Sequence, residues 1–348
     1  MNPVISIWQD ETPYQTAVKA LDLIADDLAR ALWKWRDDHP DGIVPVLIKP
    51  NLLSQDVNFP CNTDVEICVA VAQFFRNLVG CPVIVGEGTT YERTHNLSTL
   101  EAMKNHGYTE HEGLWTLLDF HADEPGTWFE TVNYETPAPV ELAVAQSVVD
   151  AFVVDVAKFK THDVLGLTLS LKNMMGTLMA ARYKDTDEII TRGDVKGYMH
   201  GFENKKPNLL TEEQNVGPSK VALAANLVRL ARCRPPNVAI IDGSTVMEGS
   251  GPRRGKVCED VKGVVIAGTD FVAVDAICAA IADIDLDSFN YVKRAGEIGL
   301  GQHDVSQVHV EGIPWTDLEH PIERHPLSEK SSPWTDEELE NFLRFTTF

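Results

Sequence analysis

Three side chains that bind anions or move protons occur within five residues, in the segment KFKTH at residues 158–162. Alternation along an extended segment places Lys158, Lys160 and His162 on one side. Two ammonium groups and an imidazole on one face form a trap for a carboxylate or a phosphate. Lysines that crowd each other also have lowered pKa values, so one of them could act as a base near neutral pH. The alternative is a solvated strand end.

A fourth cation follows in the otherwise apolar stretch LGLTLSLKNMMG, where Lys172 and Asn173 lie between leucines and methionines. Burying an ammonium group is costly unless it has a partner. Such a lysine therefore favours a functional site over a merely solvated side chain.

Other candidates come directly after apolar runs. Lys49 and Asn51 follow VPVLI, Glu87 stands between two glycines after PVIV, and Asp242 follows VAII with Glu248 six residues on. In parallel sheets, ligands bind beyond the carboxyl ends of the strands. Each position has a plainer interpretation as a turn residue or a solvated charge.

We expect two groups of site residues. The predicted catalytic residues are Lys160, His162, Lys172 and His200, the last of which lies in the segment GYMHGF; the predicted substrate-binding residues are Lys49, Asn51, Glu87, Lys158, Asn173, Asp242 and Glu248. The geometric prediction is that the side chains of Lys49, Lys160, Lys172 and Asp242 converge. Asp275, one turn into an apolar helix, is expected to pair with one of these lysines.

The elements that must position these residues alternate between strands and helices. Residues 16–35 have the apolar spacing of one amphipathic helix. Buried strands are expected at 42–51, 81–89, 150–159, 236–244, 263–270 and 305–312, with helices at 64–79, 218–233 and 269–284. Continuous apolar strands with helices between them predict an α/β fold, in which a mostly parallel sheet carries helices on both faces.

The expected organisation is a single α/β domain over residues 1–315, or two lobes at about 1–150 and 151–315. Residues 177–217 are polar and lack periodicity, which predicts an irregular, lid-like insert. Residues 316–348 form a C-terminal extension in which Thr335 and Glu338 make a capping box for a last helix.

Composition sets limits on function. The chain has 348 residues, with 52 acidic against 30 basic side chains and a net charge of −22, which disfavours a nucleic-acid surface. Its six cysteines show no zinc or iron-sulfur spacing. With no signal peptide and no apolar stretch that could span a bilayer, we expect a cytoplasmic protein without a membrane contact.

These motifs in this order resemble a family known as domain of unknown function 362. The resemblance covers roughly residues 43–285 and depends on LIKPN, the helix start at Thr63 and Asp64, VIVGEG, VAKFKTH, SLKNMMG, His200, IIDGSTVMEGSGPRRG and TDFVAVDA. It implies an α/β fold with a shared site built from the matching residues. Many members carry a C-terminal ferredoxin-like module with two cysteine-rich motifs and are associated with oxidoreductases. This chain departs from them, because no cysteine follows Cys278.

Together, the residues and the resemblance predict an enzyme acting on a small anionic metabolite by proton transfer or redox chemistry, as an oxidoreductase or as an isomerase or lyase. A metal-dependent enzyme using Glu87, His162, His200 and Asp242 is one alternative, and a non-catalytic metabolite binder or pathway scaffold is another. The cofactor stays open between a flavin, a divalent metal and an external redox partner protein; a homo-oligomer is also compatible with the sequence.

Overall fold

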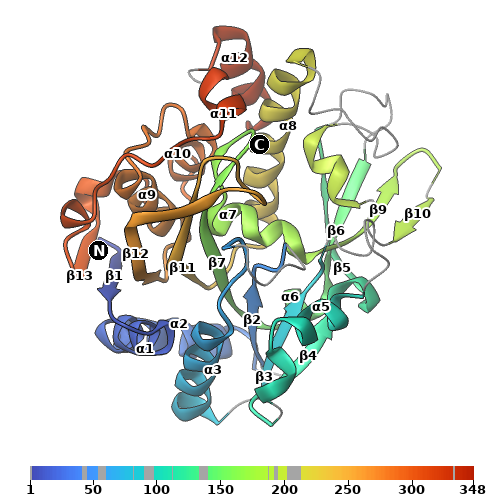
Figure 1. Cartoon of the computed structure of the whole chain (residues 1–348). Coiled ribbons are helices and arrows are strands. Elements are labelled where there is room, and N and C mark those ends of the chain that lie inside the picture. The colour runs from blue at the N-terminus through green and yellow to red at the C-terminus, as the bar shows by residue number, and fades with distance from the viewer. Residues whose placement is uncertain are drawn as a thin grey trace.

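The structure is a computed structural model that describes residues 2–40, 45–53, 60–80, 82–89, 98–111, 113–132, 140–186, 188–191, 195–201, 213–331 and 334–348. A large sheet with the strand order β13-β1-β12-β11-β7-β2-β3-β4 runs through the molecule (Figure 1). Its strands are β1 Val4–Gln9, β2 Val46–Pro50, β3 Val83–Glu87, β4 Thr116–Asp119, β7 Phe152–His162, β11 Val238–Glu248, β12 Lys256–Gly268 and β13 His309–Gly312.

The sheet is mostly parallel, as predicted. The run from β11 through β7, β2 and β3 to β4 is parallel throughout. Antiparallel pairing occurs where β12 lies between β11 and β1. The parallel run is the part that matters for the site, because it brings the carboxyl ends of β2, β3, β7 and β11 to one edge.

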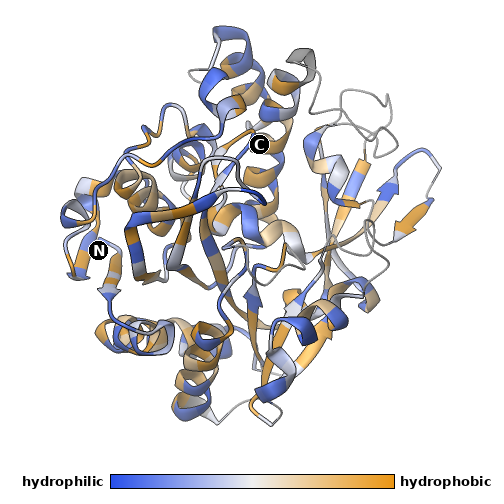
Figure 2. Ribbon diagram, viewed as in Figure 1, coloured by the Kyte–Doolittle hydropathy of each residue, from blue (hydrophilic) through white to orange (hydrophobic). Residues whose placement is uncertain are grey.

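Helices cover both faces of this sheet. One face packs against α1 Pro13–Leu23, α2 Ala25–Asp38 and α3 Val65–Val79, with Val154 and Val156 of β7 facing them. The other face packs against α7 Leu169–Asn173, α8 Glu213–Cys233, α9 Phe271–Ile281 and α10 Asn290–Glu297, with Val153 and Ala157 facing them. Because side chains alternate along a buried strand, both faces of β7 are apolar, and Figure 2 shows orange stretches in the central strands.

Residues 16–35 form two helices and not the single helix predicted. The first helix ends at Leu23, and Ile24 has φ −120° and ψ 24°, outside the helical region. The side chain of Ile24 is buried in the core together with Leu21 and Leu28. The break therefore lets both helices keep their apolar sides on the core, a tertiary requirement that periodicity alone does not report.

Three helix starts confirm the sequence interpretation. Asp64 accepts a hydrogen bond from the amide of Glu66, and Asp270 accepts from Val272 and Ala273. Thr335 and Glu338 form the expected capping box at the start of α12 Asp336–Phe345.

The expectation of an irregular segment at residues 177–217 was wrong in part. Residues 178–183 and 189–191 are strands β9 Leu178–Tyr183 and β10 Ile189–Thr191, and η4 Val195–His200 is a short 3-10 helix. Residues 187, 192–194 and 202–212 of the predicted insert lie outside the described residues. The two strands belong to a second sheet of order β10-β9-β6-β5, completed by β6 Val140–Ala145 and β5 Pro125–Glu130 (Figure 1).

The C-terminal extension packs on α8. Glu338 of α12 forms an ion pair with Lys220, at 2.8 Å, and the guanidinium of Arg229 donates to the carbonyl of Phe345 at 2.8 Å. The preceding helix, α11 Pro326–Lys330, is also connected to α8, because Lys220 donates to the carbonyl of Ser331 immediately after it.

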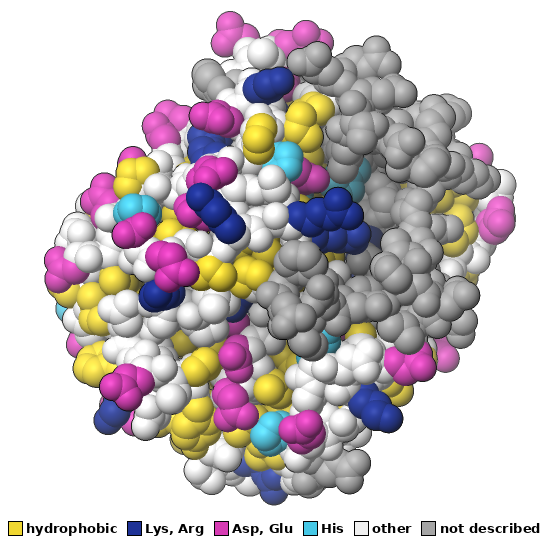
Figure 3. All heavy atoms as spheres, viewed as in Figure 1, with side chains coloured by type: hydrophobic (Ala, Val, Ile, Leu, Met, Phe, Trp, Pro, Cys, Tyr) yellow, Lys and Arg dark blue, Asp and Glu magenta, His cyan; other side chains and the backbone are white. Residues whose placement is uncertain are grey.

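In Figure 3, acidic side chains are scattered over the described part of the surface, with a smaller group of basic side chains near the middle. This distribution is typical of a solvated acidic surface. Within the described ranges, no helix combines the length and the apolar character that a membrane crossing requires.

Candidate functional site

A cavity of about 80 Å³ lies at the carboxyl edge of the main sheet, where β2, β3 and β7 end. Among the described residues, four lysines and one carboxylate line it. Its full described lining is Lys49, Asn51, Leu52, Leu53, Glu87, Gly88, Thr89, Lys160, Thr168, Lys172, Asn173, Met175, Gly176, Lys196 and Pro252. We call this space the lysine cavity.

A buried ion pair forms one wall of the lysine cavity. The Nζ atom of Lys49 lies 2.9 Å from Oε2 of Glu87, and both side chains are buried. The same ammonium donates to the carbonyl of Pro50 at 2.9 Å and to Oδ1 of Asn173 at 3.3 Å. Lys49 is therefore electrically compensated and fixed by three acceptors.

Close backbone contact at two glycines makes room for this pair. The amide of Gly88 donates to the carbonyl of Gly176 at 3.1 Å. A Cβ atom on Gly176 would overlap Oε1 of Glu87 and lie 2.5 Å from Nζ of Lys49. The glycine in SLKNMMG is thus required by the charged side chains opposite it.

Lys160 is fully buried and has a different environment. Its ammonium donates to Oδ1 of Asn51 and, at 2.8 Å, to the carbonyl of Cys61. Burial, followed by the positive charges of Lys172 and Lys158, lowers the pKa of Lys160 to about 7. This lysine exchanges its proton near neutral pH.

Lys172 and Lys196 are half-buried cations on the same cavity. Burial lowers the pKa of each to about 8, and the charge of Lys49 contributes to both shifts. Lys172 contacts the Sδ atom of Met175 at 3.9 Å, and Lys196 donates to the carbonyl of Gly88. Neither contact supplies a negative charge.

Sequence reasoning missed Lys196. It lies in η4, within the segment predicted to be irregular, and no strand end precedes it. The predicted site residue His200 follows four residues later in the same 3-10 helix, and this nearness in sequence is the signal that could have identified Lys196.

Two asparagines connect the lysines. Asn51 donates from Nδ2 to Oδ1 of Asn173 at 2.9 Å while its own Oδ1 accepts from Lys160. Asn173 in turn donates to Oδ1 of Asp155 at 2.7 Å. The predicted residues Asn51 and Asn173 thus hold Lys49 and Lys160 in one network that ends at a buried carboxylate.

Asp155 is completely buried beneath the lysine cavity, and burial raises the pKa of its carboxyl group to about 7, against the opposing charge of Lys49. Because the folded form holds a proton that the unfolded form has released, stability should fall as pH rises from about 4 to about 7.

Asp155→Asn should remove this contribution, because the amide oxygen can still accept from Asn173 and carries no titratable proton. We expect the variant to gain roughly 2 kcal/mol relative to the native chain between pH 4 and pH 7. Urea unfolding at a series of pH values measures the difference. A constant difference across that range would show that Asp155 stays ionised.

The two predicted catalytic histidines lie near Lys172, but neither lines the described part of the lysine cavity. Nδ1 of His162 accepts from the amides of Val164 and Leu165 at 3.1 and 3.2 Å, which places the ring proton on Nε2. Burial, followed by the charge of Lys172, lowers the pKa of His162 well below its ordinary value. Burial also lowers the pKa of His200, to about 3. Both imidazoles are therefore neutral.

The predicted convergence of Lys49, Lys160, Lys172 and Asp242 was wrong for Asp242, which pairs with Lys158. Asp242 lies beside Lys158 in adjacent parallel strands, on the side of β7 that faces α3. Its Oδ2 atom lies 2.9 Å from Nζ of Lys158 and accepts from the amide of Asp64 at 2.8 Å. Lys49, Lys160 and Lys172 meet around the lysine cavity, whereas Asp242 holds the start of α3 on the opposite face.

A second cavity, of about 470 Å³, lies on that opposite face. It is lined by Lys158, Asp64, Ser244 and His106 together with Pro13, Pro60, Asn62, Thr63, Val65, Asn105, Thr245 and Val257. Its lysine is compensated by Asp242, so this cavity lacks the excess of cations found at the first.

Two further carboxylates have structural contacts. Glu248 accepts from the amide of Glu323 at 2.8 Å, in the C-terminal extension, and does not line either cavity as described. Asp275 accepts from the amides of Ser170 and Leu171, both at 2.9 Å, so the expected lysine partner was wrong. Asp275 satisfies the free amides at the start of α7 instead.

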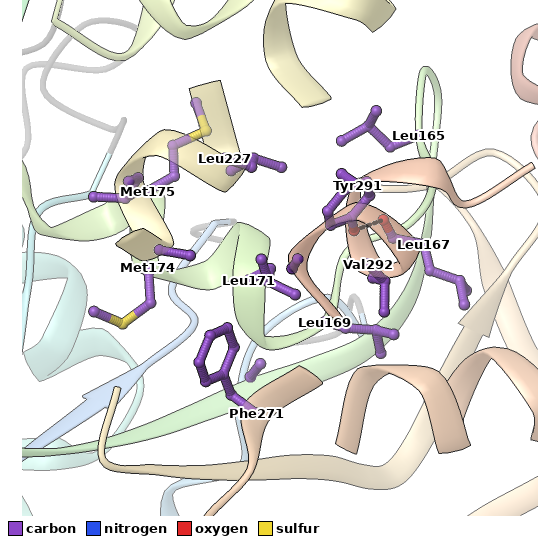
Figure 4. Close-up of a cluster of buried hydrophobic side chains, with 14 of the residues drawn as sticks. Leu165, Leu167, Leu169, Leu171, Met174, Met175, Leu227, Phe271, Tyr291 and Val292 are labelled. Atoms are coloured by element: carbon purple, nitrogen blue, oxygen red, sulfur yellow. Dashed lines mark hydrogen bonds between the residues drawn. The ribbon is translucent and has the colours of Figure 1, made fainter. Parts of the chain in front are cut away.

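Apolar packing fixes α7, which carries Lys172 and Asn173. Figure 4 shows Leu169 and Leu171 among Phe271, Tyr291 and Val292, which come from α9 and α10. Leu169 has a φ of 50°, in the left-handed region that non-glycine residues rarely adopt. The surrounding packing and the two amide contacts of Asp275 hold this conformation.

The donors of the predicted metal alternative are not gathered at one point. Glu87 is paired with Lys49, Asp242 is paired with Lys158 on the other face, and His200 contacts Ser219 at 3.0 Å. Among the described residues, the donor atoms that do lie within 4.8 Å of one another are those of Cys258, Asp260 and His320, at the edge of β12.

Comparison with known proteins agrees with this arrangement of motifs. The chain is 27% identical over 261 residues to a thylakoid-associated protein of Synechocystis, an alignment that covers 73% of this chain and 68% of that protein. A family model described as domain of unknown function (DUF362) matches residues 46–280, a range that includes all four lysines of the cavity. The chain therefore belongs to the DUF362 family.

Proposed function

We propose that this protein is an enzyme that binds a small anionic metabolite in the lysine cavity and acts on it by proton transfer next to a carbonyl group. The observation that carries the proposal is the imbalance of charge, since four lysines face one carboxylate among the described lining residues. Buried cations without partners are costly, and a bound carboxylate or phosphate would offset that cost.

The four lysines have different parts in this proposal. Lys49 is already paired with Glu87 and serves to hold the wall of the cavity. Lys172 and Lys196 have no carboxylate partner among the described residues and would bind the anion. Lys160, with its pKa of about 7, would take up and return the proton.

The size of the cavity limits the ligand. A space of about 80 Å³ can hold a few heavy atoms, which suits a small carboxylate or an inorganic phosphate.

Anion binding tests the proposal directly. Acetate, lactate, pyruvate, malonate and phosphate would be titrated into the purified chain at pH 7 by calorimetry, with melting temperature as a second readout. We expect at least one to bind, and Lys172→Met and Lys196→Met each to weaken that binding about tenfold or more, because each removes a cation from the lining of the cavity.

Lys262→Met is the matched control, because Lys262 is an exposed lysine paired with Glu259 on the surface of β12. It should bind anions as the native chain does. If the two cavity variants also bind as the native chain does, or if no anion binds, the proposal is wrong.

Turnover separates the enzyme from a non-catalytic binder. Bound pyruvate or lactate would be followed by proton NMR in deuterated water, where a proton-transfer enzyme exchanges hydrogen on carbon for deuterium. Tight binding without any exchange across the panel would favour the alternative of a metabolite-binding or scaffold protein.

A further inference from the structure

Lys160 is a buried amine near the end of β7, at the lysine cavity, and an uncharged amine can make both of its hydrogen bonds. The Nζ atom donates to two carbonyl oxygens, on Asn51 and Cys61. No carboxylate forms an ion pair with it among the described residues, in contrast to Lys49 and Lys158, which each have one. The two acceptors match the two N–H bonds of a neutral amine and leave its lone pair free.

The neighbouring charges favour the same state. Burial disfavours a third proton on the nitrogen of Lys160, and the positive charges of Lys172 and Lys158 act in the same direction, against the opposing charge of Glu87. A desolvated lysine beside another cation is an arrangement that activates amines as nucleophiles toward carbonyl carbon. Lys160 is fully buried yet lines the cavity, so a small ligand in that space would meet it.

The other lysines determine which carbonyl compound fits. Lys172 and Lys196 present positive charge to the same small cavity, and neither forms an ion pair with a carboxylate among the described residues. A ligand that satisfies both features carries a carboxylate for the cations and a carbonyl carbon close to it for the amine. Within about 80 Å³, the ligand class that meets this description is a short oxo acid.

We propose that Lys160 condenses with the carbonyl group of a small 2-oxo acid to form an imine. This inference rests on the proposed function, because it uses the same cavity and the same anion contacts, and it gives Lys160 the role of nucleophile in place of proton carrier. The nitrogen lone pair attacks the carbonyl carbon to give a carbinolamine. The carbon–oxygen bond then breaks, the oxygen leaves as water with the two protons of the amine, and a carbon–nitrogen double bond remains, so that no oxidant or reductant is needed.

The imine would explain why the amine is held so firmly. Once protonated, it withdraws electrons from the adjacent carbon, which eases loss of a proton there. Asn51 and the carbonyl of Cys61 fix the nitrogen, and Asn173 connects Asn51 to Lys49. The site thus has a preset position for the reacting atom.

Borohydride trapping tests this step. The native chain would be incubated with pyruvate or glyoxylate at pH 7.5, reduced with sodium borohydride, and analysed by intact mass and peptide mapping. We expect one adduct per chain, located on Lys160, and none with lactate, which has the carboxylate but no carbonyl. The yield should rise with pH through about 7, as the amine loses its proton.

Two variants make the result decisive. Lys160→Met should abolish the adduct while its circular dichroism and melting curve show a folded chain, and Lys172→Met should need at least about tenfold more oxo acid for the same yield. Exposed Lys262 reports background labelling.

Failure of the imine is distinguishable from failure of the proposed function. If the chain binds lactate and pyruvate through Lys172 and Lys196 but gives no adduct, or gives the same adduct after Lys160→Met, the imine is refuted and anion binding stands. If neither acid binds and neither is trapped, both proposals fail together.

Discussion

Gly176→Ala is expected to disable the lysine cavity and to lower the free energy of unfolding by about 3 to 5 kcal/mol. The added methyl group would occupy the space of the Glu87 carboxylate and press against the ammonium of Lys49. Separating this pair leaves two charges buried without their partners, which costs far more than one methyl group would suggest. Urea unfolding and anion titration measure the two effects.

Gly113→Ala is the control for backbone effects. Gly113 has a φ of 89° and nothing within 4 Å of an added Cβ, so the variant reports conformational strain alone, of about 1 kcal/mol. It should bind anions normally. A Gly176→Ala variant that is no less stable than this control would mean that Glu87 and Lys49 move aside freely.

Lys158→Met is expected to have the second large effect, on stability and not on binding. It leaves the carboxylate of Asp242 buried without a cation, although that carboxylate still accepts from Asp64 and Ser244. We expect a loss of about 3 to 5 kcal/mol, with the affinity for an anion in the lysine cavity changed by less than about threefold.

The double variant Lys158→Met with Asp242→Asn identifies the cause. An amide at residue 242 can keep a hydrogen bond from Asp64 and carries no charge, so the double variant should be more stable than Lys158→Met alone. If the two losses simply add, the ion pair is not the source of the stability, and Lys158 contributes by another route.

The main sheet could be predicted from sequence because its strands are buried on both faces and appear as continuous apolar runs. The strands that contain Lys49, Glu87, Lys158 and Asp242 all lie where these runs indicated. The second sheet escaped prediction because β9 and β10 are short and are interrupted by polar residues. β9 pairs with β6, which is more than thirty residues away in sequence, and β10 pairs with β9.

The site was predictable in its chemistry and less so in its geometry. Strand ends identify which residues reach the carboxyl edge of the sheet. The face of the sheet on which each side chain lies depends on the register of neighbouring strands. Asp242 lies in register with Lys158 and therefore shares its face. The position of Lys196 depends on how η4 packs, which no local pattern in the sequence reports.

Asp275 shows a second limit of reasoning from charge alone. A buried carboxylate requires partners, and that part of the inference was correct. The partners are two backbone amides, because α7 begins at Leu169 and its first N–H groups need acceptors. Local charge counts do not include the polar groups of the main chain.

The pairing of β1 has a consequence for how the chain folds during synthesis. Ile5 and Ile7 of β1 lie opposite Gly268 and Ile266 of β12, and the other edge of β1 pairs with β13. During synthesis, β1 therefore leaves the ribosome long before either partner strand exists. The backbone edges of β1 stay unpaired through most of translation, so the completion of the sheet is a late event that joins distant parts of the chain. A nascent chain halted before β12 would therefore be prone to aggregation.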